Sequence, residues 1–241
     1  MSDRELKKTI KAFYRNFTDV FLETFKLISI SEKELIRRAS VKNIEVLNDR
    51  LERGESVIAL TSHYCNWEWL LASCSLQLKY SPDAVYLRVK NPFFEKLMLK
   101  IRSRFGAHMI EKKYVLSEGY RRQEMTRVIA MVADQAPKGE RSLKWLKFLN
   151  QDTAFINGPE RISRILHLPV IYCKMSRTSR GFYEIEFVEV ESSPGQSNDP
   201  GITEKFGSIL EETILECPPN WLWSHNRWKQ SKPVETAPAS I

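Results

Sequence analysis

Short apolar runs alternate with helical patterns through most of this chain, and that alternation limits the folds open to it. The apolar runs predict strands at 57–60, 84–89, 128–133, 170–175 and 183–187. The stretches between and after them predict helices at 66–78, 92–105, 159–167 and 202–216. Strands that alternate with helices build a sheet covered by helices. We therefore predict an α/β fold, a single domain with a mixed central sheet flanked by helices.

Helical patterns precede the first strand. Phenylalanines recur at every fourth position from Phe13 to Phe25, so a helix over residues 3–28 carries an aromatic face. Ser31 and Glu34 have capping-box spacing, which predicts a second helix running to about residue 53. We expect one domain over 1–231, with an N-terminal helical lead-in over 1–54 and an α/β core over 55–231, followed by a disordered tail over 232–241.

Composition and charge restrict the possible functions, but less than the strand and helix pattern restricts the fold. The formal net charge is +7, which favours an anionic partner such as nucleic acid, a phospholipid surface or an acidic protein. Four widely spaced cysteines, with no C-x-x-C pair and no signal peptide, indicate a reducing compartment. No apolar run approaches the roughly 18 residues that span a bilayer.

A cluster of polar residues follows the first apolar run, in the stretch "SVIALTSHYCNWEWLL". On one continuous helix, residues five apart lie about 140° from each other, so His63 and Glu68 would not share a face. They meet only if His63 lies in the turn before a helix and Glu68 in its first turns. An imidazole oriented by a carboxylate is a general base. The alternative is a strand-end histidine beside an incidental glutamate.

The segment "HYCNWEWL" resembles the H-x-x-x-x-(D/E) block of glycerolipid-type acyltransferases, in the form found in the late lipid A acyltransferases of Gram-negative bacteria. Further blocks follow in that family's order: "YLRVKNPFFEKLMLKIRSRFGAHMIEK", "VADQAPKG", "FINGPERISRILHLPVIYCKM" and "CPPNWLWSHNRWK". The resemblance covers nearly the whole chain from about residue 5. It implies a glycerolipid acyltransferase-like fold and transfer of a fatty acyl chain from an acyl carrier protein thioester to a hydroxyl of a lipid A precursor.

The resemblance also implies roles for single residues. His63 would remove the proton of the attacking hydroxyl, and Glu68 would hold and charge-balance His63. No metal or cofactor is required, because a thioester is already activated. The tetrahedral intermediate needs donors for its oxyanion. Arg88 and Arg104 are the side-chain candidates, and the backbone at Gly158 and Pro159 is a second one.

The full set of expected substrate-binding residues is Asn66, Arg88, Arg104, Asp134, Gln135, Gly158, Pro159 and Arg227. For several of them a structural role stays open. Asn66 has the position of a helix cap, Asp134 that of a turn residue, and the two arginines could simply lie on the surface.

Aromatic residues interleave with cations in two places, Trp221–Lys229 and Lys144–Phe148. Such a surface suits an anionic membrane leaflet. We expect Trp221 and Trp223 to be partly buried and Lys144–Phe148 to be exposed. Members of the family usually begin with an apolar anchoring helix, and this sequence starts after the place where that helix would lie. Either the anchor precedes this sequence, or the protein binds membranes peripherally. We expect peripheral binding at the cytoplasmic face of the inner membrane.

Other functions remain open at this stage. A nucleic-acid-binding module would explain the pI of about 9.2, but no recognised motif is present and the basic residues are dispersed, so we expect no nucleic acid partner. A catalytically inert lipid-binding domain would have no need of both His63 and Glu68. Within the enzyme class, a different lipid or glycolipid hydroxyl is the alternative acceptor.

Overall fold

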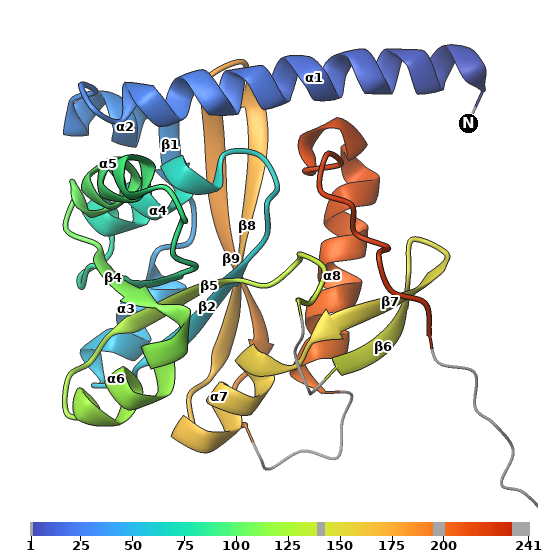
Figure 1. Cartoon of the computed structure of the whole chain (residues 1–241). Helices are drawn as coiled ribbons and strands as arrows, with labels where there is room; N and C mark the ends of the chain where they lie inside the picture. The colour runs from blue at the N-terminus through green and yellow to red at the C-terminus, as the bar shows by residue number, and fades with distance from the viewer. Residues whose placement is uncertain (1, 139–142, 195–200, 233–241) are drawn as a thin grey trace, which may run out of the picture.

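The computed structural model describes residues 2–138, 143–194 and 201–232 (Figure 1). Its main sheet contains seven strands within these ranges, and their spatial order is β1-β9-β8-β2-β5-β3-β4. In that order the strands are Ala39–Val41, Phe182–Glu191, Val170–Ser179, Val57–Thr61, Val128–Val132, Asp83–Tyr86 and His108–Glu111. The predicted α/β fold with one mixed sheet is confirmed. The predicted disordered tail lies outside the described residues, except for residue 232.

The middle of the sheet is parallel and buried. From β8 to β4 neighbouring strands run in the same direction, whereas β9 is antiparallel to β8. All five residues of β2 are buried. Helices cover both faces, so an uninterrupted apolar run is favourable here. Because the strands are parallel, their carboxyl ends meet at one edge of the sheet.

Two groups of helices cover the two faces. The helix α4 (Trp67–Gln77) connects β2 to β3, and α5 (Pro92–Ser103) connects β3 to β4. The helix α6 (Val115–Arg121) then lies between β4 and β5, and this connection crosses the sheet in the opposite direction. Right-handed connections that cross a sheet in opposite directions lie on opposite faces. The helix α7 (Gly158–Leu166) contacts both α6 and α8 (Ile202–Glu216), so these three share a face.

The side chains of β8 identify the two faces. The Tyr172 ring lies 5.7 Å from the Phe206 ring of α8, so Tyr172 points to the α6–α7–α8 side. The next residue, Cys173, points to the opposite side, because successive strand residues alternate. Burial and the neighbouring Cys74 of α4 both raise the pKa of Cys173, which agrees with α4 covering that second face.

The N-terminal lead-in is helical, with one interruption. It consists of α1 (Asp3–Lys26), α2 (Glu32–Arg38) and α3 (Glu45–Glu52). Ser31 caps α2 as predicted, since its hydroxyl accepts from the backbone N–H of Glu34 at 3.3 Å. A single helix to residue 53 is wrong, because Ala39–Val41 forms β1 along β9. Long-range pairing there outweighs local helix propensity.

The helix α1 lies across one end of the molecule, over the ends of β8 and β9 (Figure 1). Asp19 of α1 accepts hydrogen bonds from Arg177 at 2.6 Å and from Arg180 at 2.7 Å. One turn later, Glu23 accepts hydrogen bonds from Tyr183 and Asn66, each at 2.7 Å. These partly buried contacts fix α1 against the sheet and against the start of α4.

A hairpin not expected from the sequence follows residue 142. It pairs β6 (Leu143–Phe148) with β7 (Gln151–Ile156). Leu149 and Asn150 both have positive φ, as a two-residue hairpin turn requires. Phe148 is buried against Trp221, at 5.9 Å between ring centroids. The predicted exposed patch over Lys144–Phe148 is therefore wrong, because one side of the hairpin packs into the core.

Candidate active site

His63 and Asp134 lie side by side at the carboxyl edge of the sheet. Thr61 of β2 is paired in register with Val132 of β5, and each strand is followed two residues later by one member of the pair. His63 Nδ1 lies 2.7 Å from Asp134 Oδ1. The backbone N–H of His63 donates to Asp134 Oδ2 at 3.0 Å. Strand register thus holds the imidazole and the carboxylate together.

Asp134 is buried but strongly hydrogen bonded. Its Oδ2 also accepts from the indole N–H of Trp221 at 2.8 Å. Burial alone would raise the pKa of Asp134, but His63 and the indole N–H outweigh burial and lower it. An ionised Asp134 keeps the proton of His63 on Nδ1, so Nε2 is the nitrogen that can accept a proton.

The free side of the imidazole opens into a cavity. His63 lines a cavity of about 530 Å³. Gln135 Nε2 is 3.3 Å from His63 Nε2, and the ring of Trp67 packs edge-on at 4.9 Å. The histidine is therefore oriented on one side by a buried carboxylate and accessible from the cavity on the other.

The C-terminal segment contacts both the loop that carries His63 and the loop that carries Asp134. After the 3-10 turn η2 (Pro218–Asn220), Trp221 forms a β-bridge with Tyr64. The backbone N–H of Leu222 donates to the His63 carbonyl at 3.0 Å. The imidazole of His225 accepts from the Ala136 N–H at 2.9 Å. One segment thus supports both the His63 loop and the Asp134 loop.

Glu68 lies in the first turn of α4 as expected, but its partner is different. Arg102 of α5 donates to both Glu68 oxygens, at 2.9 Å from Nε and 2.6 Å from Nη2. The prediction that Glu68 holds His63 is therefore wrong, because a bidentate guanidinium occupies its carboxylate and Asp134 orients the imidazole. Glu68 and Arg102 both line the cavity.

The two arginines expected at the oxyanion lie elsewhere. Arg88 is exposed beyond β3. Arg104 donates to the Leu27 carbonyl and lies over the ring of Phe105, 4.6 Å from its centroid. Neither is among the residues that line the cavity, so the structure does not bring them to His63. Arg88 therefore lies on the surface, which is the structural alternative given for it. Arg104, at the end of α5, joins α5 to the N-terminal lead-in through the Leu27 carbonyl.

Gln135, Gly158 and Pro159 do line the cavity. Gly158 and Pro159 are the first residues of α7, whose N-terminal N–H groups favour negative charge. Asn66 is fully buried and caps α4: its carbonyl oxygen accepts from the Trp69 N–H, and its amide donates to Glu23. This placement corresponds to the capping alternative for Asn66.

Arg227 is buried, with 3 % of its surface exposed. Its guanidinium lies 4.6 Å from the centroid of the Phe155 ring, and within the described ranges no residue accepts a hydrogen bond from it. Burial lowers the pKa of Arg227 to about 10, against the opposing attraction of Asp134. Arg227 does not line the cavity, so the structure does not place it where the predicted contact with a substrate in the cavity could form.

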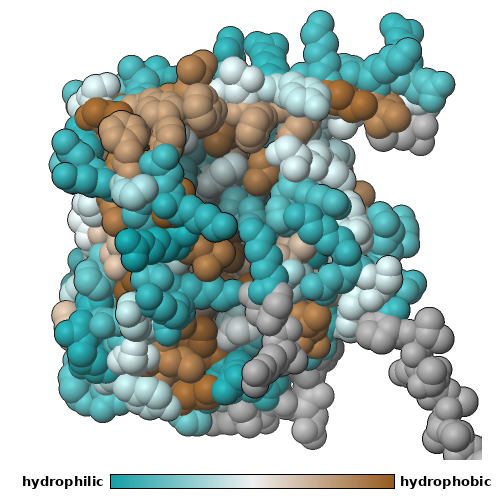
Figure 2. Space-filling model, viewed as in Figure 1, coloured by the Kyte–Doolittle hydropathy of each residue, from teal (hydrophilic) through white to brown (hydrophobic). Residues whose placement is uncertain are grey.

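The cavity has a polar mouth and apolar walls. Figure 2 shows the hollow near the middle of one face, with hydrophobic residues inside it and hydrophilic residues around it. Its polar lining residues are Thr61, His63, Glu68, Tyr86, Arg102, Lys112, Gln135 and Lys138. In the described part of the chain, no group of three or more histidine, cysteine or acidic side chains has the arrangement of a metal site.

A histidine paired with a buried carboxylate, beside a cavity with apolar walls at the carboxyl edge of an α/β sheet, is the arrangement expected of an enzyme that acts on a lipid-like substrate. A family model described as bacterial lipid A biosynthesis acyltransferase matches residues 1–230. The chain belongs to this family and is an acyltransferase, as the five sequence blocks predicted. A search of curated proteins finds no match to the chain.

Proposed function

We propose that this acyltransferase moves a fatty acyl chain from an acyl carrier protein thioester to a hydroxyl of an anionic lipid A precursor. The observation that carries the proposal is the His63–Asp134 pair at the mouth of an apolar cavity. A hydroxyl is a poor nucleophile, and a base near neutral pKa within hydrogen-bond reach is what its activation needs.

In the proposed reaction, His63 Nε2 takes the hydroxyl proton as the oxygen attacks the thioester carbonyl. The imidazolium that forms is stabilised by its hydrogen bond to the ionised Asp134. The tetrahedral intermediate then collapses, the carbon–sulfur bond breaks, and the departing thiolate takes the proton from His63. The Gln135 amide and the backbone at the start of α7 both line the cavity, and they are the proposed donors for the oxyanion.

The cavity supports the assignment of a lipid substrate. Its apolar lining includes Leu70, Leu71, Ala84, Val115, Ala130, Met131 and Ile162. Lys112 and Lys138 add positive charge to the same lining, which suits an acceptor that carries phosphate. We propose that the acyl chain lies among the apolar side chains and the acceptor head group at the cationic mouth.

We further propose that the enzyme binds peripherally at the cytoplasmic face of the inner membrane. None of the described helices is long and apolar enough to cross a bilayer. Large apolar side chains are exposed on α1, just after it and at the start of α5: Tyr14, Phe21, Leu22, Ile28, Phe93 and Phe94. Exposed cations lie on the same helix, at Lys7, Lys8, Lys11, Arg15 and Lys26. This combination favours an anionic interface.

Mass spectrometry of the product lipid tests the proposal. Purified protein is incubated with acyl carrier protein thioesters and a tetra-acylated lipid A precursor, as wild type, His63→Ala and His108→Ala. His108 is an exposed histidine of β4 and serves as the matched control. We expect a mass gain of one acyl chain with wild type and control, and none with His63→Ala. Full activity of His63→Ala would exclude His63 as the base, and transfer only to another lipid would exclude the lipid A acceptor.

A further inference from the structure

The residues that line the cavity fall into two groups, on opposite faces of the sheet. Leu60 is paired in register with Tyr172 of β8 and with Met131 of β5, so Met131 points to the α6–α7–α8 face with Tyr172. Ala130, one residue earlier, points to the α4 face. Ala84 of β3 is paired with Ala130 and points the same way.

The first group forms an alanine lobe, under α4. Its lining residues from the sheet are Thr61, Ala84, Tyr86, Met109, Ala130 and Val132, and those from α4 are Leu70 and Leu71. Ala84 and Ala130 lie next to each other on this face, and Ala59 of β2 is in register with Ala130 on its other side. Their small size opens a space between the sheet and the helix.

The second group forms an α7 lobe, on the other face. It is lined by Val85, Val115, Met131, Ile156, Gly158, Pro159 and Ile162. In Figure 2 a second hydrophobic area lies below the central hollow, over α6 and α7. The two lobes meet at the carboxyl edge of β5, next to His63, so both substrates of a transfer reaction can reach the same imidazole.

The alanine lobe is a blind slot. Ala130 is in register with Ala59, four residues before His63, so at about 3.3 Å per strand residue the alanine pair lies at most roughly 13 Å from His63 along the sheet. Val128 is the next residue of β5 on this face; it is buried and does not line the cavity. Ala84 and Ala130 therefore form the floor of the slot.

A slot between one helix and one sheet fits a single unbranched chain. An acceptor that carries a phosphorylated head group needs an open site with cations, and the exposed lysines Lys112 and Lys138 line the cavity. We propose that the alanine lobe holds the acyl chain of the donor, and that Ala84 and Ala130 set the longest chain the enzyme accepts. This inference rests on the proposed acyl transfer and adds the residues that select the donor.

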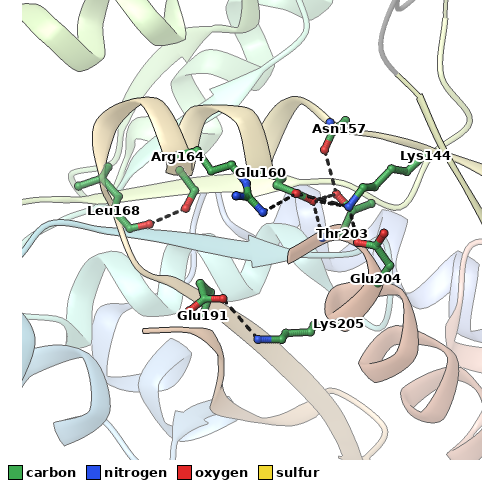
Figure 3. A network of polar contacts seen from close by, with 10 residues as sticks. Lys144, Asn157, Glu160, Arg164, Leu168, Glu191, Thr203, Glu204 and Lys205 are labelled. Atoms are coloured by element: carbon green, nitrogen blue, oxygen red, sulfur yellow. Dashed lines mark hydrogen bonds and ion pairs between the residues drawn. The ribbon is translucent and has the colours of Figure 1, made fainter. Parts of the chain in front are cut away.

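The α7 lobe provides a comparison because its wall is firmly held. Glu160 of α7 accepts from the Thr203 hydroxyl at 2.7 Å and pairs with Lys144 of the hairpin at 3.3 Å (Figure 3). Lys144 also pairs with Glu204 at 2.6 Å. None of these network residues lines the cavity, so the network holds the start of α7 without contacting a chain bound there. A Cβ at Gly158 would meet no atom within 4 Å.

The test is a donor series from decanoyl to hexadecanoyl acyl carrier protein, with kcat/KM measured for each chain. Ala130→Val and Ala84→Val add methyl groups to the slot floor. We expect the longest accepted chain to lose about tenfold or more in kcat/KM relative to the shortest, because one methylene in an apolar pocket is worth about 10–200-fold. Ala130→Gly should shift the preference towards longer chains. Gly158→Ala, in the other lobe, should change all donors by the same factor.

A second readout separates this inference from the proposed function. Binding of saturated fatty acids of the same lengths is followed by tryptophan fluorescence, with no acceptor present, and thermal unfolding checks that each variant is folded. Suppose that the variants shift the preferred fatty acid length but wild type transfers nothing to lipid A. The alanine lobe would then remain the acyl-chain site, and the lipid A precursor would be rejected as the acceptor. Transfer by wild type with an unchanged chain preference in folded Ala130→Val and Ala84→Val would overturn the slot, as would a shift caused by Gly158→Ala alone.

Discussion

Two carboxylates flank the cavity, and their surroundings differ in one decisive respect. Asp134 is 2 % exposed and Glu68 is 5 % exposed, so both would be costly to bury without partners. The partners of Asp134 are the N–H groups of an imidazole and an indole, whereas that of Glu68 is the guanidinium of Arg102. Only the first partner set contains an imidazole, the side chain that most often acts as a general base.

The difference assigns the two carboxylates to different tasks. Asp134 can stabilise a charge that appears and disappears on His63 during a reaction. Glu68 is matched by a permanent charge, so it joins α4 to α5 and gives the cavity a fixed polar wall. Proximity of an acidic residue to a histidine in the sequence therefore does not identify its partner, and the hydrogen bonds do.

The largest expected effect comes from Asp134→Asn. The amide cannot hold the proton on Nδ1 of His63, so we expect activity to fall by about 10³–10⁴-fold, as in other enzymes whose histidine loses its carboxylate. Glu68→Gln keeps its hydrogen bonds to Arg102 in part and should lose far less. The measurement is the steady-state transfer rate of Asp134→Asn and of Glu68→Gln, each relative to wild type. A larger loss for Glu68→Gln than for Asp134→Asn would reverse the assignment.

The second prediction concerns stability. Arg102→Met leaves Glu68 buried without a cation, and we expect it to lower the free energy of unfolding by about 3 kcal/mol. Arg88→Met is the control, because Arg88 is exposed and should change stability by less than about 0.5 kcal/mol. Removing both charges with Glu68→Leu and Arg102→Met should restore most of the loss. Urea unfolding measures all of these; equal stability of Arg102→Met and Arg88→Met would exclude a structural ion pair.

The β2–α4 unit shows what the sequence could predict. A continuous apolar run followed by a capping asparagine fixes a buried strand and a helix by local chemistry alone, and Asn66 does cap α4. The position of His63 in the turn between them follows from the same pattern. The final helix, Ile202–Glu216, was also predicted at its observed bounds.

Long-range partners could not be predicted in the same way. Asp134 reaches His63 only because β5 lies next to β2, and strand order is not readable from local patterns. Arg102 is 34 residues from Glu68 on another helix. The strand at Ala39–Val41 depends on β9, whose Tyr183 lies 144 residues after its partner Ala39, so helical periodicity concealed it.

Trp221→Phe is expected to have a smaller effect, because it removes one of the donors to Asp134 and keeps most of the ring. Loss of a hydrogen bond to a charged group costs about 1.5–3 kcal/mol. Trp223→Phe is the matched control, since the Trp223 indole donates to the Pro218 carbonyl and its ring is partly exposed. Thermal unfolding and transfer rates should both fall for Trp221→Phe and change little for Trp223→Phe. Equal effects would mean that the indole bond to Asp134 does not support the site.

The smallest effect is the dependence of stability on pH that Asp134 contributes. The pKa of Asp134 in the folded state is below its ordinary value of 3.8, so the unfolded chain binds the proton more readily. The stabilisation is therefore complete above pH 3.8 and is lost as pH falls from there through the folded pKa. Asp134→Asn has no such group, so the stability difference between wild type and this variant should shrink as pH falls below 3.8. A difference that grows on acidification would mean that Asp134 is protonated in the folded enzyme, and the imidazole would then have no anion to stabilise its charged form.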